Sequence, residues 1–235
     1  MILTLKDVCA GYGEKLVLNG VSLSVSEGEI VGLSGPNGSG KSTVLKSISG
    51  MIRVSSGGVC YFGQPIENRK TSLNVSAGIC YIPQGCKVFD KLSVQENMEM
   101  GGVLLRDKKL LAERIEQMYE QFPRLREYKN RPAGRLSGGE RQMVGFCTGL
   151  VMNPKLLPVD EPSIGLAPAL VSQTMALIRS LRDSFGVSVL LVEQNVKAML
   201  SIADRVYLLK LGKIVHEEPI VDDGTEGRLR ELFLS

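Results

Sequence analysis

The stretch GPNGSGKST, residues 35–43, has glycines, a lysine and two hydroxyl residues at the spacing of a phosphate-binding loop. It lies between an apolar run at 29–33, expected to be a strand, and a helical pattern that begins at Lys41. Glycines let successive backbone N–H groups converge on an anion, and the positive end of the following helix adds to the field. We therefore expect the Lys41 ammonium to reach the β- and γ-phosphates of a nucleotide, and the Ser42 hydroxyl to bind Mg²⁺. The loop residues predicted to contact the nucleotide are Gly35, Pro36, Asn37, Gly38, Ser39, Gly40, Lys41, Ser42 and Thr43.

An acidic pair ends a second apolar run, LLPVDE at 156–161. Beside a phosphate-binding loop, an aspartate at a strand tip holds Mg²⁺, and a neighbouring carboxylate can orient or deprotonate the attacking water. The sequence therefore predicts Asp160 as a metal ligand and Glu161 as a catalytic residue together with Lys41. The alternative is that two acids merely open the turn DEPSIG, and the presence of the phosphate-binding loop disfavours it.

The order of apolar patterns predicts an α/β fold. Expected strands lie at 2–8, 21–25, 29–33, 58–62, 78–82, 156–160 and 187–193, expected helices at 168–183 and 195–202, and a hairpin at 206–217. Alternation of this kind favours a mostly parallel sheet with helices on its faces, preceded here by an N-terminal antiparallel part. We expect one domain over 1–235, with a helical lobe at about 88–154 inserted into a core formed by 1–87 and 155–235.

The composition is that of an ordinary globular protein, with 43% hydrophobic residues and a formal net charge of +3. This charge is too small to indicate a dedicated nucleic-acid binder. The five cysteines are scattered and form no C-x-x-C pair, which favours a reducing, cytosolic compartment over a disulfide framework or a zinc site. We expect no segment that enters or crosses a membrane by itself.

The stretch LSGGE, residues 136–140, gives the sequence its resemblance to the nucleotide-binding subunits of ABC transporters. Ser137 and Glu140 also have the spacing of a helix capping box, and both interpretations can hold together. The resemblance implies a P-loop ABC ATPase that binds ATP and Mg²⁺. It further implies that Ser137, Gly138, Gly139 and Glu140 contact ATP held by a second ABC ATPase subunit, identical or different, in a head-to-tail dimer.

The resemblance extends over nearly the whole chain. It implies that Tyr12 stacks on adenine, that Gln84 reaches Mg²⁺ and water, and that the loop SIGLAP at 163–168 touches the opposite subunit. The alternatives are a packing role for Tyr12 and a simple polar loop position for Gln84.

Three strings, PQGCKVFDKLSVQEN, DEPSIGLAP and LLVEQN, are similar to ATPase subunits of bacterial uptake systems for branched-chain amino acids, urea and short amides. This likeness implies an ATP-hydrolysing subunit that powers solute import from the cytoplasmic, inner face of the cell membrane. The implied partners are integral membrane permease subunits and, indirectly, a periplasmic solute-binding protein. Two alternatives remain open: a soluble ABC ATPase of DNA repair or translation, and a weakly hydrolysing regulatory subunit. A small-molecule P-loop kinase does not explain LSGGE.

Several residues depart from the family pattern. Gln194 occupies the position of a histidine that contacts the γ-phosphate in most relatives, and an amide can donate to phosphate but cannot act as acid or base. We count Gln194 among the catalytic residues as a phosphate sensor, the alternative being a polar strand end. The single histidine, His216, is expected to be a solvated strand residue. Pro158 predicts an irregularity in its strand, and Thr148 stands where relatives usually have an arginine.

Overall fold

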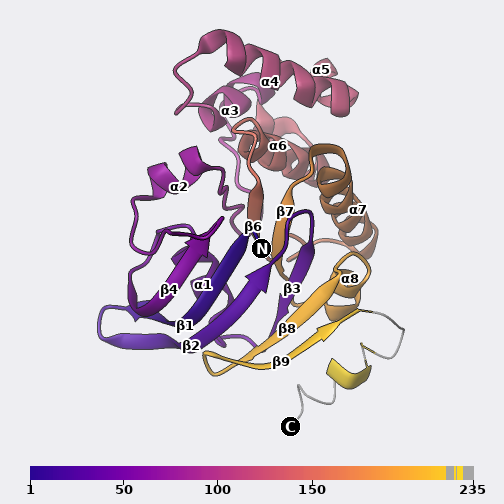
Figure 1. The fold of residues 1–235 in the computed structure, drawn as a ribbon. Coiled ribbons are helices and arrows are strands. Elements are labelled where there is room, and N and C mark those ends of the chain that lie inside the picture. The colour runs from indigo at the N-terminus through magenta and orange to yellow at the C-terminus, as the bar shows by residue number, and fades with distance from the viewer. Residues whose placement is uncertain (221–224, 226, 230–235) are drawn as a thin grey trace.

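Two β-sheets and a group of helices make up the computed structural model, which describes residues 1–220, 225 and 227–229 (Figure 1). The strands are β1 (Leu3–Tyr12), β2 (Lys15–Val25), β3 (Ile30–Ser34), β4 (Val54–Tyr61), β5 (Gln64–Pro65), β6 (Leu156–Asp160), β7 (Ser188–Val192), β8 (Arg205–Lys210) and β9 (Lys213–Pro219). The helices are α1 (Lys41–Ile48), α2 (Thr71–Ala77), α3 (Val94–Gly101), α4 (Lys108–Gln121), α5 (Pro123–Glu127), α6 (Gly138–Leu150), α7 (Pro168–Phe185) and α8 (Val196–Leu200).

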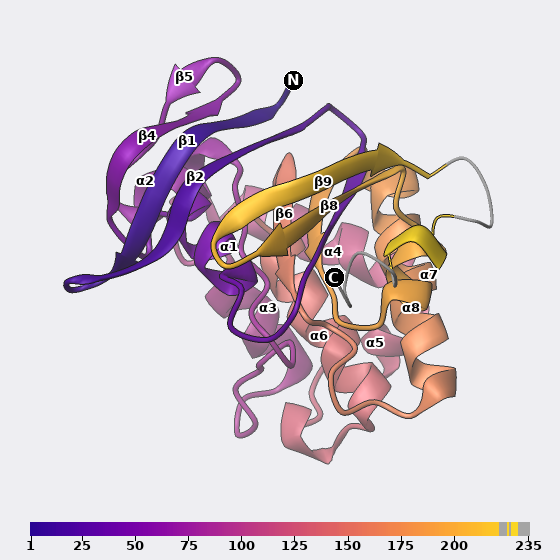
Figure 2. The same ribbon diagram turned by 90° about the horizontal axis from the view of Figure 1, so that it is seen from below.

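The first sheet is antiparallel and has the strand order β2-β1-β4-β5. Its long β1–β2 hairpin turns at Gly13 and Glu14, and register shifts along β1 bend the ribbon. Figure 2 shows this sheet on one side of the molecule, with α7 and α8 on the other. The predicted N-terminal antiparallel part is confirmed, whereas β5 and α2 were not expected.

The second sheet has the order β6-β7-β3-β8-β9 and is parallel except for β9, which returns antiparallel to β8. Leu33 of β3 and Asp160 of β6 are both paired with Val192 of β7. The carboxyl ends of three neighbouring strands therefore lie in one row. Whatever follows these strands in the sequence must emerge at the same edge of the sheet, and this edge positions the candidate site.

Alternate residues of the parallel strands face two different hydrophobic cores, as a strand's two-residue period requires. Leu190 and Val192 of β7 pack with α1 and the antiparallel sheet, whereas Val189 and Leu191 pack on the opposite face with α6, α7 and α8. The parallel sheet is thus covered on both faces, which explains why β3, β6 and β7 read as continuous apolar runs.

Helices α3 to α6 follow one another in the sequence between β4 and β6 and gather at one end of the molecule (Figure 1). The apolar stripe along α4 and α5 places Ile115, Met118, Phe122 and Leu125 in the core. Pro123 does not interrupt one helix; it stands in the first turn of α5, where its missing N–H has no helical partner to lose.

Pro158 interrupts the backbone hydrogen bonding of β6 on only one of its two sides. Its pairing with β7 runs from Leu156 to Asp160 without a register shift. On the other side, residues 78–82 run beside β6, and Cys80 N donates to Leu156 O at 3.0 Å and Ile82 N to Pro158 O at 2.8 Å. The bond that would run from residue 158 to the Cys80 carbonyl cannot form, because proline has no N–H. Residues 78–82 consequently form two isolated bridges to β6 and not the continuous strand that the sequence suggests.

Two glycines of α6 make close helix packing possible. A Cβ on Gly145 would come within 2.7 Å of the Cys86 carbonyl oxygen, and one on Gly149 within 2.8 Å of Ile82 Cδ1. The glycines lower the helix propensity of α6, but they let it lie directly against residues 80–86. Thr148 donates its hydroxyl to Val144 O at 2.9 Å within the same helix.

None of the helices in the described part of the chain is long and apolar enough to cross a membrane. All five cysteines carry free thiols. His216 lies on β9 with its side chain about one-third exposed and its Nε2 3.6 Å from Glu218 Oε1.

Candidate functional site

The loop between β3 and α1 wraps the first turn of α1. Gly40 is the N-cap of α1 with φ of 109°, a conformation that side-chain-bearing residues rarely adopt. Gly35 lies so close to β8 that a Cβ there would come within 2.2 Å of the Leu209 carbonyl oxygen. Because both positions exclude a side chain, the loop stays compact. The free N–H groups at the start of α1 then point toward the row of strand ends, where they can bind an anion.

Lys41 carries its positive charge into the centre of this loop. Its side chain is almost fully buried, and Nζ donates to Gly35 O at 2.8 Å and to Pro36 O at 3.2 Å. The Glu161 carboxylate lies 3.8 Å from Nζ, which offsets the loss of solvation that burial of an ammonium brings. The lysine is therefore held inside the loop that the sequence predicts to bind phosphate.

Ser42 and Asp160 meet across the gap between α1 and β6. Ser42 Oγ donates to Asp160 Oδ1 at 3.0 Å, and Tyr81 Oη donates to Asp160 Oδ2 at 2.7 Å. Two ligands at right angles around Mg²⁺, with bonds of about 2.1 Å, also lie about 3 Å apart. Hydroxyl and carboxylate oxygens are the donors that Mg²⁺ prefers, so the pair fits the ion.

Tyr81 is a site residue that the sequence did not reveal. Burial, followed by the hydrogen bond to Asp160, raises the pKa of Tyr81 well above its ordinary value near 10. The phenol therefore stays protonated at physiological pH and acts as a permanent donor to Asp160. Tyrosine beside an apolar run is usually read as core, and only the proximity of residues 78–82 to β6 gives it this partner.

Glu161 is held by two amide side chains. Gln84 Nε2 donates to its Oε2 at 3.2 Å, and Gln194 Nε2 donates to its Oε1 at 2.9 Å. Glu161 itself has φ of 42°, and its N–H donates to Val192 O at 2.9 Å. This left-handed conformation turns the chain out of β6 directly after Asp160, so that the carboxylate faces Lys41. Three residues distant in the sequence thus converge on one carboxylate.

A cavity of about 780 Å³ opens in front of these residues. Its lining contains Tyr12 from the end of β1, Lys41 and Ser42 from α1, and Glu161 with its two amide partners. The candidate residues that line it are Tyr12, Asn37, Gly38, Gly40, Lys41, Ser42, Thr43, Gln84, Glu161 and Gln194. Gly35, Pro36, Ser39 and Asp160 are not among the lining residues and support it through the bonds described above or through the loop itself.

Tyr12 stands at the rim of this cavity, about half exposed, with the ammonium of Lys46 5.8 Å from its ring centroid. The ring lies apart from the hydrophobic cores and offers an open face to a ligand. The tip of the β8–β9 hairpin closes the opposite side, where Gly212 N donates to Ser39 O at 3.0 Å.

The LSGGE residues do not join this cavity. Ser137 caps α6 in a capping box: its N–H donates to Glu140 Oε2 at 2.9 Å, and Glu140 N donates to Ser137 Oγ at 3.4 Å. The Ser137 N–H, followed by the Ser137 hydroxyl that donates to Oε2 at 2.8 Å, lowers the pKa of Glu140, and Arg124 lies 3.1 Å from its Oε1. Ser137, Gly139 and Glu140 border a smaller cavity of about 210 Å³, which shares no lining residue with the one at Lys41.

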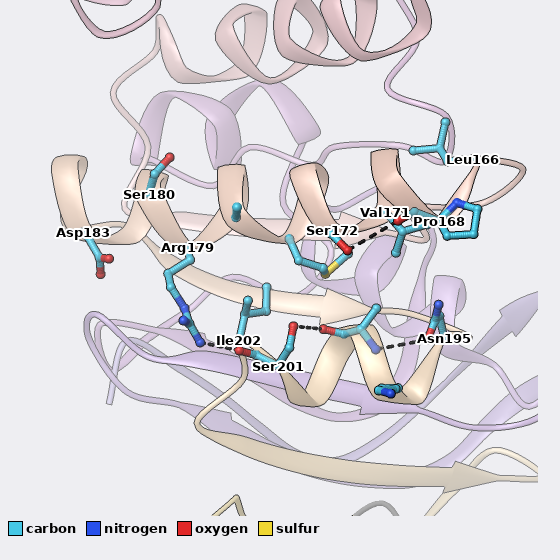
Figure 3. A pocket seen from close by; sticks show the side chains of 14 residues that line it. Leu166, Pro168, Val171, Ser172, Arg179, Ser180, Asp183, Asn195, Ser201 and Ile202 are labelled. Carbon is cyan, nitrogen blue, oxygen red and sulfur yellow. Dashed lines mark hydrogen bonds between the residues drawn. The ribbon is translucent and has the colours of Figure 1, made fainter.

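A further cavity of about 800 Å³ lies between α7 and α8. Figure 3 shows its walls, where Arg179 donates to the Ser201 carbonyl oxygen and Asn195 accepts from the start of α8. Its lining includes none of the candidate site residues, and its serines bond to backbone carbonyl oxygens of their own helices. We assign it no chemistry.

The fold and the site together define a P-loop nucleotide-binding protein: a parallel sheet whose strand ends carry a glycine-rich phosphate loop, an acidic pair and an aromatic rim. The family model described as ABC transporter matches residues 18–164. The chain belongs to the ABC transporter ATP-binding family. This match includes the phosphate loop, Gln84, LSGGE and the acidic pair, whereas Tyr12 and Gln194 lie outside it.

Two curated relatives are both described as branched-chain amino acid transport ATP-binding proteins. The chain is 40% identical over 233 residues to the high-affinity branched-chain amino acid transport ATP-binding protein BraG of Pseudomonas aeruginosa, covering 99% of each chain. It is 41% identical over 205 residues to the probable branched-chain amino acid transport ATP-binding protein LivF of Archaeoglobus fulgidus, covering 87% of this chain and 86% of the relative. The solved ADP conformation of the ATP-binding cassette MJ1267 covers 100% of this chain and 98% of its own, with a TM-score of 0.86 and 27% identity.

These findings confirm several of the predictions made from the sequence. The α/β P-loop fold with its antiparallel part is confirmed, and the chain is an ATP-binding subunit of an ABC transporter with the ATPase activity of such cassettes. The relatives do not favour a soluble ABC ATPase of DNA repair or translation, nor a weakly hydrolysing regulatory subunit.

Proposed function

We propose that the chain powers the import of branched-chain amino acids, or of related small amides or urea, by hydrolysing ATP with Mg²⁺ at the Lys41 cavity. The solute class rests on the names of the two curated relatives and on nearly full-length identity to the first of them. The catalytic assignment rests on one observation: the Glu161 carboxylate is held by Gln84 and Gln194 and faces Lys41.

In this proposal each group has one task. Glu161 directs a water molecule toward the γ-phosphate, and its two amide partners fix its orientation. The Lys41 ammonium stabilises the charge on the phosphate oxygens, and Gln194 senses the γ-phosphate by donating a hydrogen bond without exchanging a proton. When Mg²⁺ is bound, Ser42, Asp160 and Gln84 would hold it, and the ion would neutralise phosphate charge. Tyr12 would stack on the adenine ring.

A second subunit would complete the site. Ser137, Gly139 and Glu140 border a different cavity from Lys41, and Gly138 stands between them in the sequence. One chain therefore does not bring its own LSGGE residues to its own phosphate loop. The start of α6 nevertheless offers N–H groups and a hydroxyl to an anion. We propose that these residues contact ATP bound to a partner ABC ATPase, either a second copy or a related chain, in a head-to-tail dimer.

The remaining partners follow from the same role. We propose that residues about 88–154 act as a helical lobe within a single domain and transmit motion to membrane permease subunits. The protein would lie on the cytoplasmic face of the membrane, bound to these subunits, while a periplasmic binding protein delivers the solute. No nucleic acid is involved.

A reconstituted transporter tests the proposal. The chain is purified with its permease subunits, placed in vesicles and supplied with its binding protein loaded with leucine, urea or a short amide. We expect leucine-type amino acids to stimulate both ATP hydrolysis and solute uptake, and Glu161→Gln to abolish both. Stimulation by urea or an amide alone would reassign the solute within the proposed group, and stimulation by none of the three would contradict the import function.

A further inference from the structure

Glu193 is a buried carboxylate with no role in the proposed hydrolysis of ATP. It follows β7 directly and is 2% exposed. An ionised carboxylate loses favourable hydration in such a place unless other groups replace the water. Among the described residues it has no lysine, arginine or histidine within ion-pair distance. Its burial therefore needs another explanation, and its hydrogen bonds supply one.

Each oxygen of Glu193 binds a different segment. Oε1 accepts from Gln194 N at 2.8 Å and from Asn195 N at 3.0 Å, which closes the turn after β7. Oε2 accepts from Ser163 Oγ at 2.7 Å and from Ser163 N at 3.3 Å, in the loop after the acidic pair. Four donors thus meet one side chain, and charge-assisted bonds of this kind are stronger than neutral ones.

These bonds close a ring around the catalytic carboxylate. Ser163 is two residues beyond Glu161, and Gln194 is the next residue after Glu193. Gln194 Nε2 returns to Glu161 Oε1 at 2.9 Å. Strands β6 and β7 lie side by side in the sheet (Figure 1), so the ring joins the two loops that leave neighbouring strands. A shift of either loop would have to break a bond to Glu193 or move the Gln194 amide away from Glu161.

We propose that Glu193 is a positioning residue: its carboxylate fixes the Gln194 turn and the Ser163 loop as one unit, and thereby holds the Gln194 amide on Glu161. This inference rests on the proposed function of Glu161 and Gln194. The negative charge is required because all four facing groups are donors in the observed arrangement. A neutral amide of the same shape would accept from one segment and turn its own N–H groups toward the other.

The test is a double-mutant cycle between Glu193→Gln and Gln194→Ala, read as steady-state ATP hydrolysis by the assembled transporter. We expect Glu193→Gln to lower kcat at least tenfold while KM for ATP changes less than twofold, because the residue acts on orientation and not on binding. Since Glu193 acts through Gln194, the double variant should be no slower than the slower single variant. Ser163→Ala, which removes one of the four bonds, should lower kcat about threefold with the same non-additivity.

Glu29→Gln is the matched control. Glu29 also accepts a backbone N–H, from Ser26 at 2.7 Å, and pairs with Arg205, but it precedes β3 at the opposite edge of the sheet. We expect this control to lower the melting temperature and leave kcat within twofold of the wild type. Should Glu193→Gln behave like this control, the residue is only structural and the inference is overturned. Multiplicative loss of kcat in the double variant would overturn it as well.

The cycle separates this inference from the proposed function. If Glu161→Gln is inactive and Gln194→Ala is impaired while both Glu193→Gln and Ser163→Ala turn over normally, only the role of Glu193 falls. If Glu161→Gln retains turnover, the catalytic assignment itself falls, whatever the other variants do. Ser163→Ala keeps the inference testable if Glu193→Gln fails to fold.

Discussion

Removing the hydroxyl of Tyr81 and removing that of Tyr119 should have different effects on the stability of the protein. Tyr81 Oη donates to the Asp160 carboxylate at 2.7 Å, whereas Tyr119 Oη is buried and has no hydrogen-bond partner among the described residues. Tyr81→Phe removes a donor from a charged acceptor, and Tyr119→Phe removes an unsatisfied polar atom from the core. The chemical change is identical, so the two variants differ in whether the lost hydroxyl had a hydrogen-bond partner.

The size of the stability loss in Tyr81→Phe depends on the charge of the acceptor and on how deeply Tyr81 is buried. A hydrogen bond to a charged group contributes about 1.5–3 kcal/mol, and Tyr81 is only half-buried, which favours the lower figure of about 1.5 kcal/mol because water can partly replace the phenol. For a chain of this length each kcal/mol shifts the melting temperature by about 2–4 °C. Tyr81→Phe should therefore melt about 3–6 °C lower. Tyr119→Phe should melt at the wild-type temperature or up to a few degrees higher, because an unsatisfied buried hydroxyl costs about 1–3 kcal/mol.

Differential scanning calorimetry of the two variants and the wild type, in one buffer without nucleotide, measures this difference. The cation–π contact of Arg126 with the Tyr119 ring, 5.4 Å from the centroid, is retained in phenylalanine and does not confuse the comparison. Equal melting temperatures for the two variants would refute the assignment of Tyr81 as the donor that holds Asp160.

Two further predictions concern α6. Gly145→Ala should destabilise the protein although alanine gains about 1 kcal/mol of helix propensity, because the new Cβ would lie 2.7 Å from the Cys86 carbonyl oxygen and overpacking costs about 1–3 kcal/mol. Gly138→Ala, whose Cβ would have no atom within 4 Å, is the control and should melt at the wild-type temperature or slightly above it; a stabilised Gly145→Ala would contradict the close packing. The second prediction concerns the capping box, which lowers the pKa of Glu140. The stability that the ionised Glu140 adds to the folded protein is complete above the unfolded pKa of about 4.3, and it is lost as the pH falls through the lower folded pKa. Urea unfolding at several pH values should therefore show a shallower acid loss for Glu140→Gln than for the wild type, and identical slopes would exclude this linkage.

The sequence predicts those parts of the site that are local. Two continuous segments can be predicted from their own residues: the loop at 35–43 and the acidic pair at 160–161, each with the strand before it. In both, the residue types and their spacing are those that phosphate or Mg²⁺ binding requires. The parallel sheet follows from the alternation of apolar runs and helices. Gln194 could be placed near the phosphates only through resemblance, and the structure adds that its amide donates to Glu161.

The rest depends on contacts between distant segments, which a single sequence does not encode in any readable spacing. Tyr81 meets Asp160 because residues 78–82 run along β6. Glu193 looks like one more polar residue at a strand end until Ser163 is found on its second oxygen. The two glycines in α6 look like weaknesses of the helix, and only the neighbouring backbone of Cys86 explains one of them.

The most direct measurement is a comparison of ATP binding and single-turnover hydrolysis for the wild type and Glu161→Gln. Lys41 loses its ion pair with Glu161 but keeps its hydrogen bonds to Gly35 O and Pro36 O, so ATP should bind with an affinity within a few-fold of the wild type. The hydrolysis rate should fall by about 10²–10⁴, the usual contribution of a positioned acid–base group. Hydrolysis at the wild-type rate with normal ATP binding would contradict the claim that Glu161 directs the attacking water.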